Sequence, residues 1–298
     1  APYVDKKEPL PAPRVSPRAR SADSSRSGFE DQIRGHFGLD VRPEVARKGQ
    51  GRGAAEPYLA RPWVDIRKPR SMEPPPWLTP KQSQIAESLF AQRLAMHPVL
   101  VKQTMHRLPD TGLPQIAFIG RSNAGKSTLV NGLLQDRQVA VTSRTPGRTR
   151  HLFTFDLEDL SIVDLPGYGF ARVTVDLQRD WVVMMDEYFA VSTRLRRVVC
   201  LIDARKGLQD IDTDFWRVVR SHKRTLQVVL TKADILGPQE LHDSVLRIMM
   251  QMQEWSTEAD VHPYLHAVSA QNGHGMDELR ANLSTVPFVV GEARDEEE

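Results

Sequence analysis

The chain has 298 residues, of which 40% are hydrophobic and 26% charged, and this balance is typical of a globular protein with a buried core. Its single cysteine, Cys200, excludes an intrachain disulfide framework and a cysteine-rich zinc site. The longest apolar runs fall short of the roughly 20 residues of a membrane-spanning helix, and a net charge of +2 does not by itself indicate a nucleic-acid-binding protein.

The first quarter of the chain differs from the rest in composition. Residues 1–75 carry 15 Lys and Arg against 10 Asp and Glu, and 12 of the 21 prolines lie between Pro2 and Pro76. Such a segment buries too little apolar surface to offset the entropy of ordering it. We therefore predict a Pro/Arg-rich extended arm over 1–77. It is either a passive linker or an arm that orders on a partner through the anchors Tyr58, Leu59, Trp63 and Ile66.

Apolar runs alternate with amphipathic stretches after the arm. Thr79 and Pro80 are typical of a helix start, and they predict a helix over 79–97 within a helical lead-in at 78–110. Further helices are expected at Lys126–Leu134, Leu177–Leu195, Asp212–His222, Pro238–Trp255 and Gly275–Leu283. Strands are expected at Gln115–Gly120, His151–Leu157, Leu160–Leu165, Arg197–Asp203, Leu226–Lys232 and Leu265–Ser269. This alternation predicts an α/β domain over 111–290 with a mainly parallel six-stranded sheet, followed by an acidic tail at 291–298.

The segment Gly120–Ser127 reads GRSNAGKS and matches the phosphate-loop pattern G-x-x-x-x-G-K-[ST]. Glycines allow this backbone to turn several amides toward an anion, and the next helix presents its positive end. Lys126 brings a positive charge to the outer phosphates, while Ser127 offers a hydroxyl to Mg²⁺. The residues expected to bind the nucleotide here are Gly120, Ser122, Asn123, Ala124, Gly125, Lys126, Ser127 and Thr128.

Further motifs follow predicted strands and narrow the choice of nucleotide. Asp164 at a strand end can hold magnesium, and the Gly167 amide can donate to the terminal phosphate. The carboxylate of Asp234 in Thr231-Lys232-Ala233-Asp234 can accept two N–H donors from guanine, a pair that adenine lacks. Ser269 and Ala270 would back the base from the other side. Each motif is weak alone, but their joint placement at strand ends favours GTP over ATP.

A loop rich in Pro, Gly and Thr, Ser143–Arg150, lies between the phosphate loop and Asp164. Such a loop can stay mobile until one of its threonines binds magnesium and senses the terminal phosphate. Arg144, Arg148 and Arg150 in this loop are internal cations for the phosphates, contacts for RNA, or simply solvated charges.

Together these residues resemble the translation-factor-related small GTPases and, more closely, the EngB family of ribosome-biogenesis GTPases. The resemblance covers roughly residues 98–290 and rests on four segments: Leu113–Ser127, Thr145–Thr149, Asp164–Gly169 and Thr231–Asp234. It implies a P-loop GTPase fold and catalytic roles for Lys126, Thr149 and Gly167, with Thr145 as the alternative switch threonine. It also implies that Ser127, Thr149 and Asp164 bind magnesium, and that Thr231, Lys232 and Asp234 bind guanine.

Two positions bear on the rate of hydrolysis. Tyr168 stands where Ras-like enzymes carry the Gln that orients the attacking water, so we expect a slow intrinsic GTPase. Asn123 stands where related potassium-dependent GTPases carry a K⁺-binding Asn, and a bound K⁺ would offset developing charge. The other interpretation of Asn123 is a plain loop residue.

The resemblance implies a GTP-controlled factor that helps mature the large ribosomal subunit. Its partners would be large-subunit rRNA with ribosomal proteins or other assembly factors, and the free protein would be a monomer without a membrane partner. Arg194, Arg196 and Arg197 either reach RNA or balance a helix end. The basic arm favours the mitochondrial matrix, with the cytoplasm as the alternative. A scaffold that holds GTP as a static ligand and a GTPase of tRNA modification are the other candidate functions.

Overall fold

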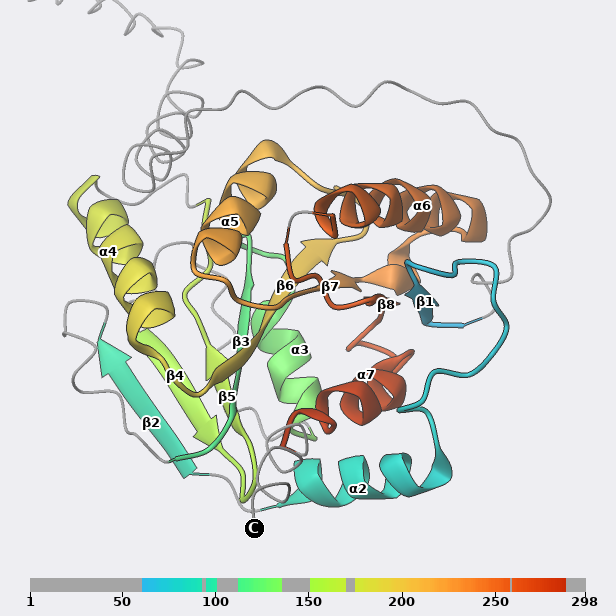
Figure 1. Ribbon diagram of the computed structural model, residues 1–298, viewed down its shortest axis with the longest axis horizontal. Coiled ribbons are helices and arrows are strands. Elements are labelled where there is room, and N and C mark those ends of the chain that lie inside the picture. The colour runs from blue at the N-terminus through green and yellow to red at the C-terminus, as the bar shows by residue number, and fades with distance from the viewer. Residues whose placement is uncertain are drawn as a thin grey trace, which may run out of the picture.

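The computed structural model describes residues 61–92, 95–100, 112–135, 151–169, 175–257 and 259–287 (Figure 1). Its strands are β1 (Trp63–Asp65), β2 (Ala95–Leu100), β3 (Gln115–Gly120), β4 (His151–Asp156), β5 (Ser161–Asp164), β6 (Leu195–Asp203), β7 (Leu226–Thr231) and β8 (Tyr264–Ala267). Its helices are α2 (Pro80–Ala91), α3 (Lys126–Leu133), α4 (Val175–Val191), α5 (Asp210–Ser221), α6 (Pro238–Trp255) and α7 (Met276–Leu283), with the 3-10 turn η3 (Ala233–Ile235) after β7.

One mixed sheet forms the centre of the molecule, with the strand order β1-β8-β7-β6-β3-β5-β4-β2. The five central strands, from β8 to β5, are parallel. At one edge β1 pairs antiparallel with β8, and at the other β4 pairs antiparallel with β5 and β2 pairs antiparallel with β4. The predicted α/β fold is confirmed. The expected number of six strands is wrong, because the described residues form eight.

The two unexpected strands come from segments with weak strand signals. β1 has only three residues and follows Pro62, and β2 carries Pro98 at the sheet edge, where a residue without an N–H is tolerated. The helix predicted over 79–97 begins as expected, since the Thr79 hydroxyl accepts from the Gln82 amide at 3.1 Å. It ends at Ala91, so the lead-in is a helix followed by a strand.

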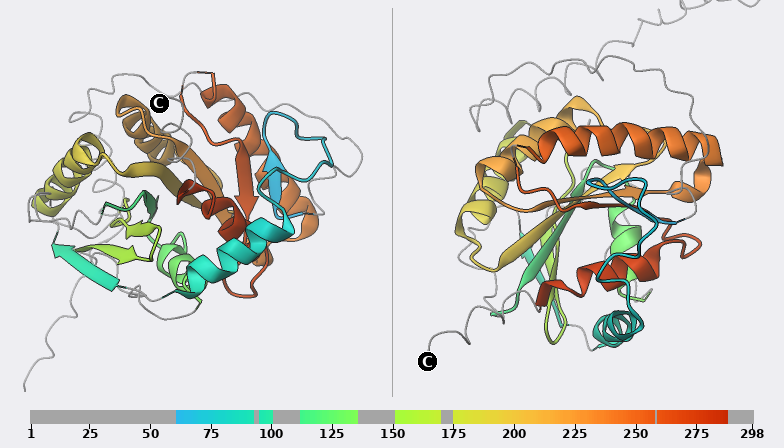
Figure 2. Two further views of the ribbon diagram at one scale, coloured as in Figure 1. Left: turned by 60° about the horizontal axis from the view of Figure 1, so that its bottom comes forward. Right: turned by 45° about the vertical axis from the view of Figure 1, so that its right-hand side comes forward.

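Helices cover both faces of the sheet (Figures 1 and 2). On one face α4, α5 and α6 pack in one apolar cluster, and on the other α2, α3 and α7 pack in a second. Val182, Met185, Tyr188 and Phe189 of α4 are buried in the first of these clusters. Cys200 is also buried, which raises the pKa of its thiol to about 12 and makes it a core residue rather than a nucleophile.

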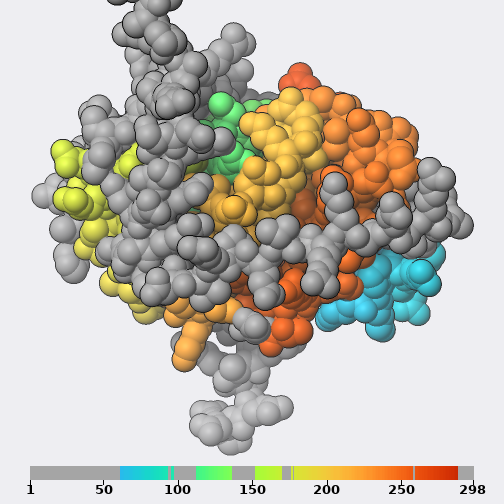
Figure 3. All heavy atoms as spheres, turned by 90° about the horizontal axis from the view of Figure 1, so that it is seen from above, coloured from blue at the N-terminus to red at the C-terminus, as the bar shows by residue number. Residues whose placement is uncertain are grey.

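Part of the predicted arm belongs to the folded domain. β1 pairs with β8, and the indoles of Trp63 and Trp77 meet the Tyr264 ring edge to face at 6.2 and 5.3 Å. Figure 3 shows this N-terminal segment in blue at one rim of the molecule, beside the orange C-terminal half. The predicted boundary at 77 is therefore wrong, because Trp63 and Ile66 are buried against their own domain. The anchors Tyr58 and Leu59 lie outside the described residues.

We predict that Trp77→Ala destabilises the domain by about 3 to 5 kcal/mol, because it leaves a cavity among Trp63, Tyr264 and His266. Urea unfolding followed by circular dichroism measures the effect. Met72→Ala is the matched control, since the Met72 side chain is 61% exposed, and its unfolding midpoint should stay that of the wild type. An unchanged midpoint for Trp77→Ala would contradict the packing of this segment.

Candidate nucleotide-binding site

The phosphate loop connects the carboxyl end of β3 to the first turn of α3. Gly125, which precedes α3, has a φ of +90°, in the left-handed region that favours glycine. Gly120 is required for another reason, because a Cβ there would lie 2.7 Å from the Leu201 carbonyl oxygen on β6. The backbone conformation of Gly125 thus favours a glycine, whereas Gly120 is required by the close approach of β6.

Amides at the start of α3 are free to bind an anion. Within the described residues, the amides of Gly125, Lys126 and Ser127 donate to no other backbone carbonyl. The first amides of a helix have no partner within the helix, and together with the helix dipole they attract negative charge. This end of α3 is suited to bind phosphate groups.

The segment after β5 lies directly against the phosphate loop. The Tyr168 amide donates to the Gly120 carbonyl at 3.2 Å, and the Ser122 amide donates to the Tyr168 carbonyl at 3.0 Å. A Cβ on Gly167 would lie 2.8 Å from the Gly120 carbonyl oxygen, so only glycine fits there. The structure therefore brings Gly167 and the phosphate loop together, as the sequence predicts.

Lys126 and Asp164 meet at the centre of this arrangement, where the Lys126 ammonium donates to the Asp164 carboxylate. The Asp164 side chain is only 3% exposed, so its charge needs a compensating cation. A bound triphosphate would compete for the Lys126 ammonium and leave the carboxylate to another cation.

Two of the oxygen ligands expected for magnesium lie on described elements: Ser127 in the first turn of α3, next to Lys126, and Asp164 at the end of β5. A hydroxyl and one carboxylate fit Mg²⁺, which is commonly held by one or two carboxylates together with substrate phosphates. Among the described residues, no group of three His, Cys, Asp or Glu could hold a metal without such a substrate. Thr149 and Thr145 lie outside the described residues, as does all of Ser143–Arg150.

The segment after β7 packs on the other side of the phosphate loop. The Thr231 hydroxyl donates to the Ala124 carbonyl at 2.5 Å, and the Lys232 ammonium donates to the Asn123 carbonyl at 2.6 Å. Lys232 also forms an ion pair with Asp203 at 3.0 Å. The Thr231 hydroxyl therefore holds the phosphate loop in place.

Asp234 lies on the exposed turn η3, and its carboxylate is open to a base placed along Lys232. Ser269 is fully buried, and its hydroxyl accepts from the amides of Gln271 and Asn272 within its own loop. Ala270 is half-buried and faces α3, where a Cβ on Gly132 would lie 3.4 Å from the Ala270 Cβ. The Ser269 hydroxyl therefore shapes the loop, and only the backbone and Ala270 remain to contact a base.

Tyr168 points away from the phosphate loop and into the core. Its hydroxyl donates to Asp212 Oδ1 at 2.6 Å, and its ring stacks on Phe215 at 5.2 Å. Burial raises the pKa of Tyr168 well above its ordinary value, with the nearby Cys200 and Asp212 adding to the shift. The side chain is fully buried, so it cannot orient a water molecule at the phosphates.

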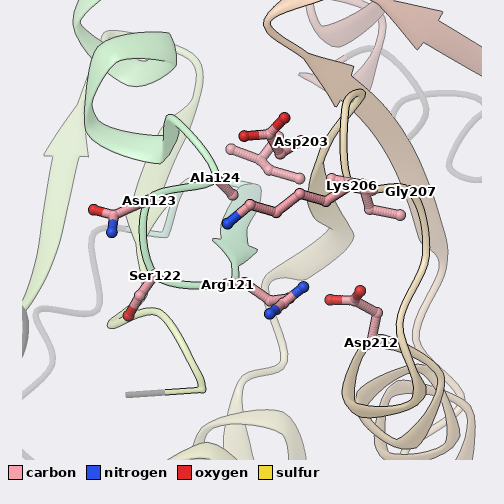
Figure 4. Close-up of a pocket in the computed structure, with 10 residues that line it drawn as sticks. Arg121, Ser122, Asn123, Ala124, Asp203, Lys206, Gly207 and Asp212 are labelled. Carbon is pink, nitrogen blue, oxygen red and sulfur yellow. The ribbon is translucent and has the colours of Figure 1, made fainter. Parts of the chain in front are cut away.

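A small polar cavity separates the loop from the start of α5 (Figure 4). Arg121 and Asp212 point toward each other there, and Lys206 reaches toward Ala124. Its volume is about 10 Å³, which is room for about one water molecule.

The sequence did not single out Asp203, Asp212 or Arg121. Burial raises the pKa of Asp203, but the bonds from Arg205 and Lys232 outweigh it and lower that pKa to about 2. A carboxylate at the end of strand β6 and the Gln209-x-x-Asp212 spacing of a capping box were the available signals.

The fold and this site define the class of protein, a P-loop nucleotide-binding protein with the guanine-selecting segment of a GTPase. The family model described as 50S ribosome-binding GTPase matches residues 115–232. Two bacterial proteins described as probable GTP-binding protein EngB are similar over most of their length. The Rhodospirillum rubrum protein is 41% identical over 66% of this chain and 86% of its own, and the Caulobacter vibrioides protein is 37% identical over 69% and 88%.

The chain therefore belongs to the EngB family of GTP-binding proteins, and it is a GTPase. A crystal structure of a probable GTP-binding protein engB aligns with 59% of this chain and 99% of its own, at 22% identity and a TM-score of 0.46. The family assignment rests on the sequence relatives. None of the helices in the described part of the chain is long and apolar enough to cross a membrane.

We predict that Tyr168→Phe lowers the free energy of unfolding by about 1 to 3 kcal/mol, because it leaves the buried Asp212 carboxylate without its hydroxyl donor. The single-turnover rate of GTP hydrolysis should stay within about threefold of the wild type, since the hydroxyl does not reach the phosphates. Urea unfolding and rapid-quench kinetics measure the two effects. A loss of rate greater than tenfold without a loss of stability would show that the tyrosine acts on the substrate.

Proposed function

We propose that this GTPase is a switch that assists assembly of the large ribosomal subunit in the mitochondrial matrix. The observation that carries the switch is the contact between Gly167–Tyr168 and Gly120, which places the segment after β5 beside the expected terminal phosphate. Membership of the EngB family and the match to the 50S ribosome-binding GTPase model support the ribosome as the target. The excess of basic residues in the arm supports the mitochondrial matrix over the cytoplasm.

In this proposal the chain's own residues distinguish GTP from GDP. The Lys126 ammonium leaves Asp164 for the outer phosphates, and the Gly167 amide donates to the terminal phosphate. Ser127, Asp164 and Thr149 would hold Mg²⁺, which neutralises phosphate charge when bound. The segments Ser143–Arg150 and Gly167–Val175 would contact GTP and form the surface that docks on the immature subunit, and hydrolysis would remove these contacts and release the factor.

The proposal includes a slow intrinsic rate, because the buried Tyr168 offers no group to the attacking water. An added partner surface, RNA or K⁺ would raise the rate. The Asn123 side chain is exposed, so its carboxamide oxygen is accessible to a cation beside the phosphates.

We therefore expect GTP turnover at least tenfold faster in KCl than in NaCl. A bound K⁺ would stabilise the charge that develops in the transition state, and a tenfold rate corresponds to about 1.4 kcal/mol of activation free energy. Asn123→Ala should abolish this difference and leave the rate in NaCl unchanged. Equal wild-type rates in the two salts would remove the potassium site and leave Asn123 as a loop residue.

Purification of the full chain from cells with a non-hydrolysable GTP analogue, followed by sequencing of the bound RNA, tests the target. We expect large-subunit rRNA together with ribosomal proteins or other assembly factors. Lys126→Ala, which removes the phosphate-binding cation, should lose this association. The alternative of a scaffold with static GTP predicts that Lys126→Ala supports assembly normally. Recovery of tRNA would instead indicate a GTPase of tRNA modification, and absence of RNA would contradict the proposal.

A further inference from the structure

A group of basic side chains lies where the central strands begin, on the side of the sheet opposite the nucleotide site. Because β3, β6 and β7 are parallel, their amino ends all lie on this side, away from the phosphate loop and Thr231. Two chain segments lie there: 191–197, which runs from the end of α4 into β6, and 219–225, which runs from the end of α5 to the start of β7.

These two segments are side by side, although more than 20 residues of sequence separate them. The Arg224 guanidinium donates to the Phe189 carbonyl at the end of α4, with a distance of 3.0 Å from Nε. The Val198 amide donates to the Thr225 carbonyl at 2.8 Å, which ties the start of β6 to the segment before β7.

The charge of these segments contrasts with that of the chain around them. They contain six Lys and Arg and no Asp or Glu, whereas residues 76–298 carry 25 Lys and Arg against 28 Asp and Glu, a net charge of −3. Arg197 takes no part in the surface, because it is buried and donates to Gln227 and Asn282. The expectation that Arg197 reaches RNA is therefore wrong. Arg220 lies over the Trp255 ring at 5.5 Å.

Apart from Arg197 and Arg220, four cations of these segments are exposed or half-buried, and we call them the basic edge: Arg194, Arg196, Lys223 and Arg224. Within the described residues, no carboxylate forms an ion pair with any of the four. The neighbouring acids Asp186 and Asp260 are bonded to His222 and Thr225. Burial and the positive charge of Arg196 both lower the pKa of Arg224, although the nearby Tyr188 raises it.

Balancing of helix ends does not account for this number of charges. The carboxyl ends of α4 and α5 both point to this edge, and each carries a partial charge of about −0.5. Two helix ends thus call for about one positive charge, and four are present. The nearby carboxylates of Asp186 and Asp260 offset part of this positive charge without pairing with the four cations, and the excess of like charge is unfavourable unless an anion is bound there.

We propose that the basic edge binds the phosphodiester backbone of folded RNA. This inference rests on the proposed function, and it names the surface by which the protein holds the RNA of its target. Guanidinium and ammonium groups spaced along one edge fit a row of phosphates, and such contacts require no base readout. The nucleotide site lies at the other edge of the sheet, so RNA held here leaves the phosphate loop and the segment after β5 open.

The test compares two charge reversals in the full-length chain. Arg196→Glu with Lys223→Glu alters the basic edge, and Lys81→Glu with Arg247→Glu makes the same change of charge at exposed positions of α2 and α6. Fluorescence anisotropy measures binding to a labelled 20-base-pair RNA hairpin between about 50 and 300 mM KCl. Basic-edge reversal should weaken binding at least tenfold and reduce the salt slope by about 2, while the control changes affinity less than threefold.

The inference would be overturned if both double variants lost the same RNA affinity, or if reversal of the basic edge left RNA affinity unchanged. It would also be overturned if the reversal weakened binding to phosphatidylglycerol vesicles or to an acidic peptide, measured in parallel, but not binding to RNA. Binding of a fluorescent GTP analogue should match the wild type in both variants, which shows that the domain is folded. Co-sedimentation with large ribosomal subunits separates the two proposals. If only the wild type and control sediment with the subunit, both stand. If the wild type and both double variants sediment equally, the basic edge does not hold the RNA of the subunit, and this inference is wrong. If the wild type does not sediment, the proposed target is wrong.

Discussion

The phosphate loop is held from two sides, and the rest of the site depends on this constraint. On one side the Tyr168 amide donates to the Gly120 carbonyl, and on the other the Thr231 hydroxyl donates to the Ala124 carbonyl. Each bond joins the loop to a segment that follows a different parallel strand. Because the strands of the sheet fix these segments, the phosphate-binding and base-binding groups keep their relative positions before any ligand arrives.

The same constraint explains why the position after Gly167 is a tyrosine. A side chain that pointed at the phosphates would leave the segment after β5 held only by its backbone. Tyr168 instead anchors it in the core through Asp212 and Phe215. Asp212 also accepts from the Gln209 amide at 2.8 Å, so one carboxylate joins the start of α5 to this segment. The Tyr168 side chain therefore fixes the position of Gly167 and does not reach the phosphates. This agrees with the proposal that a partner surface, RNA or K⁺ raises the rate of hydrolysis.

Local patterns in the sequence were sufficient for the elements that build the site. The bounds of β3 and α6 agree with the prediction, and those of α3 and β5 differ by one residue at the ends concerned. These elements have strong apolar patterns or caps, and each glycine of the phosphate loop has a physical reason, a positive φ at Gly125 and a close backbone approach at Gly120. Each predicted residue of the loop and of Thr231–Asp234 lies at the carboxyl edge of the sheet.

The missed features depend on contacts between distant parts of the chain. β1 has three residues whose strand conformation comes from pairing with β8, about 200 residues later, and Trp77 is buried by Tyr264. No local pattern contains that information. Arg197 looks like its exposed neighbours in sequence, and only the approach of Gln227 and Asn282 makes a buried arginine tolerable. The basic edge likewise requires the pairing of β6 with β7 to bring its two segments together.

In the site proposed here, one pocket holds the triphosphate on the amides of α3 and selects guanine through Asp234. Isothermal titration calorimetry of the full chain and of Asp234→Asn, each with GTP and with ATP, tests this pocket most directly. We expect the wild type to bind GTP at least 100-fold more tightly than ATP, about 2.7 kcal/mol, and Asp234→Asn to lose most of this difference. Equal affinities of the wild type for GTP and ATP would contradict it.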